Sequence, residues 1–250
     1  MIQNRPLRHA KIALHRRARH LRRDTRALAM IEMAVTLPTL LLLSFGGLEI
    51  SSLMLAHTRI SNIALSVADN ASRIASDSGL ANPQVREVDV NDVFRGAQIE
   101  SGSMNLLANG RVILSSLELN DDGGQWIHWQ RCYGNMNVAS AYGPQGTGAT
   151  GTGFAGMGDE GSEVKAGEGN PIMFVEITYR YQPAVLASLY DAPIDIDYEA
   201  AFAVRDARDT SQIFNPNPSA TVANCPTGVQ RKKRRNRTRH NGWGGGWGRH

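Results

Sequence analysis

The chain has 250 residues, with 27 Lys and Arg against 23 Asp and Glu, so its formal net charge is +4. Its 42% hydrophobic and 20% charged residues exclude a wholly disordered chain and a polytopic membrane protein. Its two cysteines exclude a cysteine-rich scaffold and a metal site built from four thiolates.

The charge is unevenly distributed along the chain. Residues 1–27 hold nine basic residues and one acidic residue, and residues 231–250 hold eight basic residues and no acidic one. The other ten basic and 22 acidic residues lie in 28–230. The sequence therefore predicts an acidic body of net charge −12 between two basic ends of +8 each.

Residues 28–56 predict a membrane helix directly after the basic leader. No residue from Met33 to Leu48 is charged, but a span needs about 20 apolar residues, so the predicted helix also includes Glu32 and Glu49. A buried core helix and a cleaved secretory signal are the alternatives. The dense arginine block argues against the first, and the helical pattern after Glu49 argues against the second. The positive-inside rule places the leader in the cytoplasm and the body outside it.

Glu32 has two interpretations. It is either hydrated at the cytoplasmic edge or part of a signal similar to that of type IV prepilins, because an ionisable residue within a membrane segment is costly. In the second case, cleavage between Ala27 and Leu28 makes Glu32 the fifth residue of the mature chain. The new α-amino group of one subunit could then pair with the Glu32 carboxylate of a neighbour, and neither charge would be left alone in lipid.

Beyond the span, the pattern predicts that the same helix continues with one apolar stripe and ends near Asp77-Ser78-Gly79 and Asn82-Pro83. Arg59, Asn62, Asp69 and Arg73 lie off the stripe. The stripe consists of Ile60, Ile63, Ala64, Val67, Ala68, Ala71, Ile74 and Ala75.

The rest of the body predicts a small antiparallel sheet. A short strand near Val85–Val90 and a helix over Val93–Leu107 are expected first. Asn120–Gly124 has the composition of a hairpin turn between two alternating segments. With the long helix against the sheet, the fold class is α+β and pilin-like. The predicted strands are 111–119, 125–133, 172–181 and 194–204.

Residues 142–170 are rich in glycine and are interpreted as a flexible surface loop. Gly146, Gly148 and Gly151 satisfy the G-x-G-x-x-G spacing, but a dinucleotide site also needs a strand before the motif and a helix starting at it. Neither is predicted here, so a dinucleotide site is rejected.

Cys132 and Cys225 lie on the exported side, where a disulfide is the natural state, and two unpaired thiols are the alternative. The body holds two histidines, His57 and His128, which are far apart in sequence, and no serine lies in a G-x-S-x-G motif. Asp195 and Asp197 alternate on a predicted strand and are interpreted as a solvated face. The sequence therefore predicts no catalytic residues, no metal site and no cofactor.

Taken together, these segments resemble the TadE-like family, minor pilin-like proteins of the tight-adherence (Flp-type) pilus system. The resemblance covers about residues 22–226. By this resemblance Glu32 takes the role of the pilin glutamate, a prepilin peptidase cuts between Ala27 and Leu28, and Pro38 and Glu49 are secondary anchor residues. The residues that carry it are Ala29–Ala34, Leu37-Pro38, Leu48-Glu49, Trp129–Cys132, Met173–Tyr179 and Ala201–Asp206.

The resemblance implies a non-catalytic minor pseudopilin needed for pilus assembly at the bacterial inner membrane. Its N-terminus would be cytoplasmic and its domain of residues 57–226 periplasmic. Its partners would be other pilin-like subunits, proteins of the assembly platform and the prepilin peptidase, and nucleic acid is not expected.

The basic, Gly/Trp-rich tail, residues 227–250, departs from the family pattern. Basic residues beside tryptophan can bind phosphate-rich polymers by charge and stacking. The alternative function is therefore a membrane-anchored periplasmic protein that binds an anionic polymer through this tail. A solvated tail without a role is the simpler interpretation.

Overall fold

The computed structural model describes residues 25–74, 83–185, 192–204, 208–216, 218–226 and 229–230. The basic leader up to residue 24 and the tail from residue 231 lie outside these residues. The chain divides into two compact units. The first is Met1–Ser52 with Pro183–Leu189, and the second is Leu53–Gln182 with Tyr190–His250.

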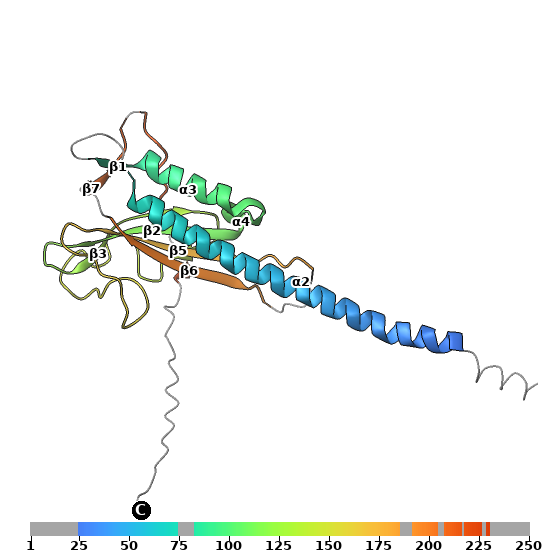
Figure 1. Cartoon of the computed structure of the whole chain (residues 1–250). Helices are drawn as coiled ribbons and strands as arrows, with labels where there is room; N and C mark the ends of the chain where they lie inside the picture. Colours follow the sequence, from blue (N-terminus) through green and yellow to red (C-terminus); the bar gives the residue numbers. More distant parts are fainter. Residues whose placement is uncertain are drawn as a thin grey trace, which may run out of the picture. The chain divides into compact units, whose positions relative to one another are not determined.

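Helix α2, Thr25–Ser72, is one continuous helix of 48 residues (Figure 1). It contains Pro38, which lacks a backbone N–H and costs stability in a helix interior in water. The helix ends at Ser72, and the Asp77–Gly79 and Asn82 stop signals lie outside the described residues. The predicted helix is confirmed, with its end a few residues earlier.

In the second unit, the C-terminal part of α2 buries the predicted stripe. Ile60, Ile63 and Ala68 are fully buried, whereas Arg59 and Asn62 are exposed. Ala75, the last predicted stripe residue, lies outside the described residues. The helical period in the sequence therefore identified the face that packs on the sheet.

The main sheet has four antiparallel strands in the order β3-β2-β5-β6. The predicted hairpin is confirmed, since the Asn120 side-chain oxygen accepts the backbone N–H groups of Asp122 and Gly124 and closes the β2–β3 turn. The fold is α+β, as predicted. The strands are β2 Gly110–Leu119, β3 Gln125–Tyr133, β5 Ile172–Arg180 and β6 Asp195–Ala203.

The segment between α2 and the sheet differs from the prediction. Strand β1 is Gln84–Arg86 and α3 is Glu87–Ser101, so the helix begins six residues before Val93. The cause is the helix start: the Asp89 carboxylate accepts the backbone N–H of Arg86 at 3.3 Å, and acidic residues in the first turn favour a helix N-terminus. After α3 come a 3₁₀ turn, η1 Gly102–Met104, and a short helix, α4 Leu106–Asn109.

Two short parallel pairings were not predicted. Strand β7, Asp209–Phe214, pairs with β1, and β8, Val229–Gln230, pairs with β4, Val138–Ala139. Both pairings attach the C-terminal segment to elements that precede it by 90 residues or more.

Both faces of the sheet are covered by other segments of the chain. On one face, the C-terminal part of α2 and α3 form one core with strand residues such as Val175 and Ile196 (Figure 1). Phe94 of α3 stacks on Tyr133 of β3 with ring centroids 5.7 Å apart. A second cluster covers the other face around Met157.

The glycine-rich residues 142–170 form this second cover, so their interpretation as a plain flexible surface loop is wrong. Met157 is fully buried, and Tyr142 packs edge-on against Phe174 at 5.3 Å. The loop also bonds the edge of β3, where the Ile127 N–H donates to the Thr147 carbonyl oxygen at 2.9 Å. Within 142–170, all described, no helix starts.

Candidate functional site

The first half of α2 exposes apolar side chains in every direction. Successive helix residues point about 100° apart, and the four leucines Leu40–Leu43 are all exposed, Leu43 to 70%. A helix that is apolar all round suits a membrane or the core of a large protein. From Leu28 to Leu55, the exposed apolar side chains are Leu28, Met30, Ile31, Met33, Val35, Leu37, Leu40, Leu41, Leu42, Leu43, Phe45, Leu48, Ile50, Met54 and Leu55.

The polar side chains of this stretch bond to the helix itself. The hydroxyl of Thr36 donates to the Glu32 carbonyl oxygen at 2.8 Å, and that of Thr39 to the Val35 carbonyl oxygen at 3.0 Å. Ser51 bonds the Gly47 carbonyl oxygen in the same way. Such bonds let polar residues face lipid without an unsatisfied donor. Among the described residues, α2 is the one helix long and apolar enough to cross a membrane.

The predicted processing residues lie at the start of this helix. Ala27 belongs to the first turn of α2, although its side chain is outside the described set, and Leu28 is exposed. Glu32 is also exposed and lies four residues after Leu28, on the same helix face. Pro38 lies ten residues after Leu28, within the apolar stretch.

Glu49 has a different environment from Glu32. It is only 3% exposed, although Leu48 and Ile50 beside it are exposed. Its Oε2 accepts the backbone N–H of Val185 at 3.0 Å, in the connection between β5 and β6. Glu49 therefore bonds a distant segment of the first unit, a contact that sequence spacing does not reveal.

The Trp129–Cys132 block is a structural junction. Trp129 is buried in the core under α2 and α3, and the Gln130 side-chain amide donates to the Ser115 hydroxyl at 3.0 Å. Arg131 donates to both carboxylate oxygens of Glu87 at 3.0 Å, and Cys132 forms a disulfide with Cys225 with a Cα–Cα distance of 4.8 Å. Each residue of the block thus fixes a different neighbour of β3.

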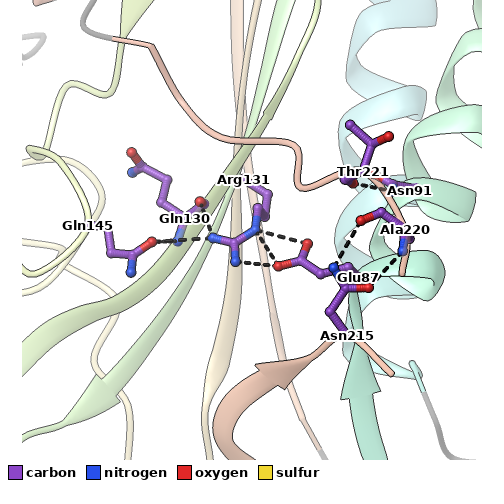
Figure 2. A network of polar contacts seen from close by, with 8 residues as sticks. All are labelled: Glu87, Asn91, Gln130, Arg131, Gln145, Asn215, Ala220 and Thr221. Carbon is purple, nitrogen blue, oxygen red and sulfur yellow. Dashed lines mark hydrogen bonds and ion pairs between the residues drawn. The ribbon is translucent and has the colours of Figure 1, made fainter. Parts of the chain in front are cut away.

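Figure 2 shows the Arg131 guanidinium between Gln145, from the glycine-rich loop, and Glu87, from the first turn of α3. The same view shows the C-terminal segment beside α3, where the Asn91 amide donates to the Thr221 carbonyl oxygen at 2.8 Å. The Cys132 N–H donates to the Ala223 carbonyl oxygen at 2.8 Å. The disulfide therefore closes a segment that is already held by hydrogen bonds.

A second polar group lies on the opposite face of the sheet. The buried Glu176 carboxylate accepts the Ser140 hydroxyl at 2.6 Å and the Ala141 N–H at 2.8 Å. The Tyr142 hydroxyl donates to Glu199 at 2.7 Å. Burial, followed by the bond to Glu199 and the nearby carboxylates, raises the pKa of Tyr142 well above its ordinary value. The phenol therefore serves as a fixed hydrogen-bond donor.

His57 and His128 each lie against an aromatic ring. His57 lies edge-on to Tyr198 at 6.3 Å. His128 stacks on Trp126 at 4.4 Å, and its Nδ1 lies 3.0 Å from Glu118 Oε1. The Ser116 hydroxyl donates to that same carboxylate oxygen and not to the imidazole, so these residues do not form an activated nucleophile.

The predicted solvated aspartates occupy the edge strand β6. Asp195 pairs with Arg180 at 2.9 Å, and Asp197 is half-buried. No group of three metal-ligating side chains comes together in the part of the chain that the structure describes.

The long helix α2 is the part of the chain that resembles a known family. The family model of TadE-like proteins matches residues 28–73. This TadE-like segment begins three residues inside α2 and ends one residue after it, so it is the long helix itself. No curated protein and no solved structure matches the chain significantly. The match is therefore confined to the long helix, and the likeness of Trp129–Cys132 and the later blocks remains a sequence resemblance.

Proposed function

We propose that the chain is a non-catalytic minor pseudopilin, anchored in the bacterial inner membrane by α2 and needed for assembly of a tight-adherence pilus. The observation that carries this proposal is the coincidence of the TadE-like match with a helix that exposes apolar side chains on all sides. In water such a surface would aggregate, whereas in a bilayer it is the surface that lipid and neighbouring helices require.

The orientation follows from the charge pattern. The basic leader precedes the apolar stretch, so it stays in the cytoplasm, and the body of residues 57–226 lies in the periplasm. The Cys132–Cys225 disulfide supports this side for the body, because disulfides persist in oxidising compartments. The acidic body then faces the periplasm.

The role proposed for Glu32 depends on its distance from the cut. After cleavage between Ala27 and Leu28, the new amino group is four residues from Glu32 on the same helix face. An ammonium and a carboxylate at one end of a span can pair between neighbouring subunits and set the depth of one helix against the next. Pro38 is compatible with this position, since membrane helices tolerate proline where neighbouring helices and hydroxyls satisfy the backbone.

The partners follow from the same surface. The exposed apolar side chains of α2 would pack against the helices of other pilin-like subunits and of assembly platform proteins, and the prepilin peptidase would act at Ala27 and Leu28. A subunit of this kind works by geometry and burial, so no catalytic residue is assigned to it.

Substitution of Glu32 tests the proposal. Pili are counted by electron microscopy, and pilin-like subunits that co-purify with the chain are measured after cross-linking. We expect Glu32→Ala to reduce both by about tenfold or more, as loss of one buried ion pair implies. Glu100→Ala, which removes an exposed carboxylate from α3, is the matched control and should have no effect. Normal piliation with Glu32→Ala would contradict the proposal.

The polymer-binding alternative rests on the eight basic residues of 231–250 and on Trp243 and Trp247. Deletion of 231–250 should leave pilus assembly intact if the pseudopilin proposal holds. Loss of all function on this deletion, with Glu32→Ala harmless, would favour the polymer-binding function.

A further inference from the structure

Glu49 of α2 contacts Val185 of the connection between β5 and β6. These residues are 136 positions apart in sequence, and both belong to the first compact unit. The Glu49 Oε2 accepts the Val185 backbone N–H at 3.0 Å, and Glu49 is 3% exposed. A carboxylate in the apolar part of α2 is thus bonded to the backbone of the connection between β5 and β6.

The connection has an apolar composition. From Pro183 to Tyr190 the sequence contains no charged residue, and the Val185 side chain is 45% exposed. Loops on protein surfaces usually carry polar residues at exposed positions. The exposed Val185 side chain, next to its bonded backbone amide, is compatible with a lipid surface.

The length of α2 places Glu49 at a particular depth. Leu28 to Glu49 is 22 residues, which at the helical rise of 1.5 Å per residue span about 33 Å. The hydrocarbon core of a bilayer is about 30 Å thick. If Leu28 lies at the cytoplasmic boundary, Glu49 lies at the periplasmic boundary, where an interfacial side chain reaches both lipid and water.

We propose that Glu49 is a positioning residue that holds Pro183–Val185 against α2 and makes Val185 a second lipid contact, at the periplasmic surface of the bilayer. The proposal rests on the proposed function in one respect, namely that α2 spans the membrane. The carboxylate offsets the cost of an unbonded backbone donor near lipid, and the exposed Val185 side chain adds apolar area at the level of Glu49.

Photocrosslinking in native membranes tests this contact with the full chain. A photoreactive phenylalanine analogue replaces Val185, and phospholipid adducts are measured by mass spectrometry. Leu42, in the middle of the apolar stretch, is the positive control, and Val222, an exposed valine of the second unit at 37%, is the matched negative control. We expect adducts at Val185 and Leu42 and none above background at Val222.

Two substitutions then test the role of Glu49. Glu49→Leu removes the acceptor, and Glu49→Gln keeps a side-chain oxygen that can accept the Val185 N–H. Loss of one hydrogen bond worth about 1 kcal/mol predicts about fivefold fewer adducts at Val185 in Glu49→Leu and recovery in Glu49→Gln. Adducts at Leu42 should not change in either variant.

The outcomes separate the two proposals. Adducts at Leu42 but none at Val185 would overturn the second lipid contact and leave the membrane span standing. Absence of adducts at both positions would contradict the span itself. Equal adducts at Val185 in Glu49→Leu and in the unsubstituted protein would overturn the positioning role of Glu49.

Discussion

The Arg131 guanidinium donates to both carboxylate oxygens of Glu87, a residue only 2% exposed, and so joins the edge strand β3 to the first turn of α3. Removing one member of a buried pair leaves the other charge uncompensated. We therefore expect Arg131→Met to lower the free energy of unfolding by about 3–5 kcal/mol.

The measurement is denaturant unfolding of the full chain in detergent micelles. Arg180→Met is the matched control, since the Arg180–Asp195 pair is largely exposed and its loss should cost less than about 1 kcal/mol. Equal losses in the two variants would mean that burial of Glu87 does not govern the strength of its pair.

The Cys132–Cys225 disulfide predicts a second stability effect. It closes a loop with a sequence separation of 93 residues, and removal of such a bond costs about 2–5 kcal/mol. Reduced protein and the Cys132→Ser, Cys225→Ser double variant should unfold at the same, lower denaturant concentration. If oxidised and reduced protein unfold together, the bond does not stabilise the C-terminal segment.

Gly148 tests whether the glycine-rich loop is a packed layer. Its φ is +79°, and a Cβ there would overlap the carbonyl oxygen of Gln125 in β3. Gly148→Ala should destabilise the body by at least about 1–2 kcal/mol, from the left-handed backbone alone. Gly153→Ala, where a Cβ meets open space, is the control and should leave the unfolding midpoint unchanged. A neutral Gly148→Ala would show that the loop does not depend on this contact.

The raised pKa of Tyr142 predicts a loss of stability in alkaline solution. A tyrosine whose pKa is higher in the folded state holds its proton there after the unfolded chain has lost it, so unfolding becomes more favourable above the ordinary pKa near 10. Each such tyrosine contributes up to about 1.4 kcal/mol per pH unit. In unfolding measured from pH 9 to 12, Tyr142→Phe should show a shallower decline than the unsubstituted protein. Parallel declines would contradict this assignment.

Local patterns predicted the elements that depend on neighbouring residues in sequence. The stripe containing Ile60 and Ile63 repeats with the helical period, and Asn120–Gly124 supplies the polar side chain and glycines that a hairpin turn uses. Both depend only on residues close in sequence, so the structure agrees with them. The start of α3 also had a local signal, in Glu87 and Asp89, which sequence reasoning overlooked.

The remaining features depend on contacts that sequence spacing does not encode. Glu87 and Arg131 are 44 residues apart, and Glu49 and Val185 are 136 apart. The packing of the glycine-rich loop was missed because its many glycines indicated a flexible loop. Met157, which lies within it, is fully buried and holds the loop on the sheet. Nonlocal pairing decides which polar residues become buried, and composition alone does not.

The measurement that tests the central claim most directly is mass spectrometry of the N-terminus of the protein purified from membranes. The account predicts a mature chain that begins at Leu28, and an uncleaved chain when the prepilin peptidase is absent. A chain from wild-type membranes that still begins at Met1 would contradict pilin-type processing and leave α2 as an uncleaved membrane anchor.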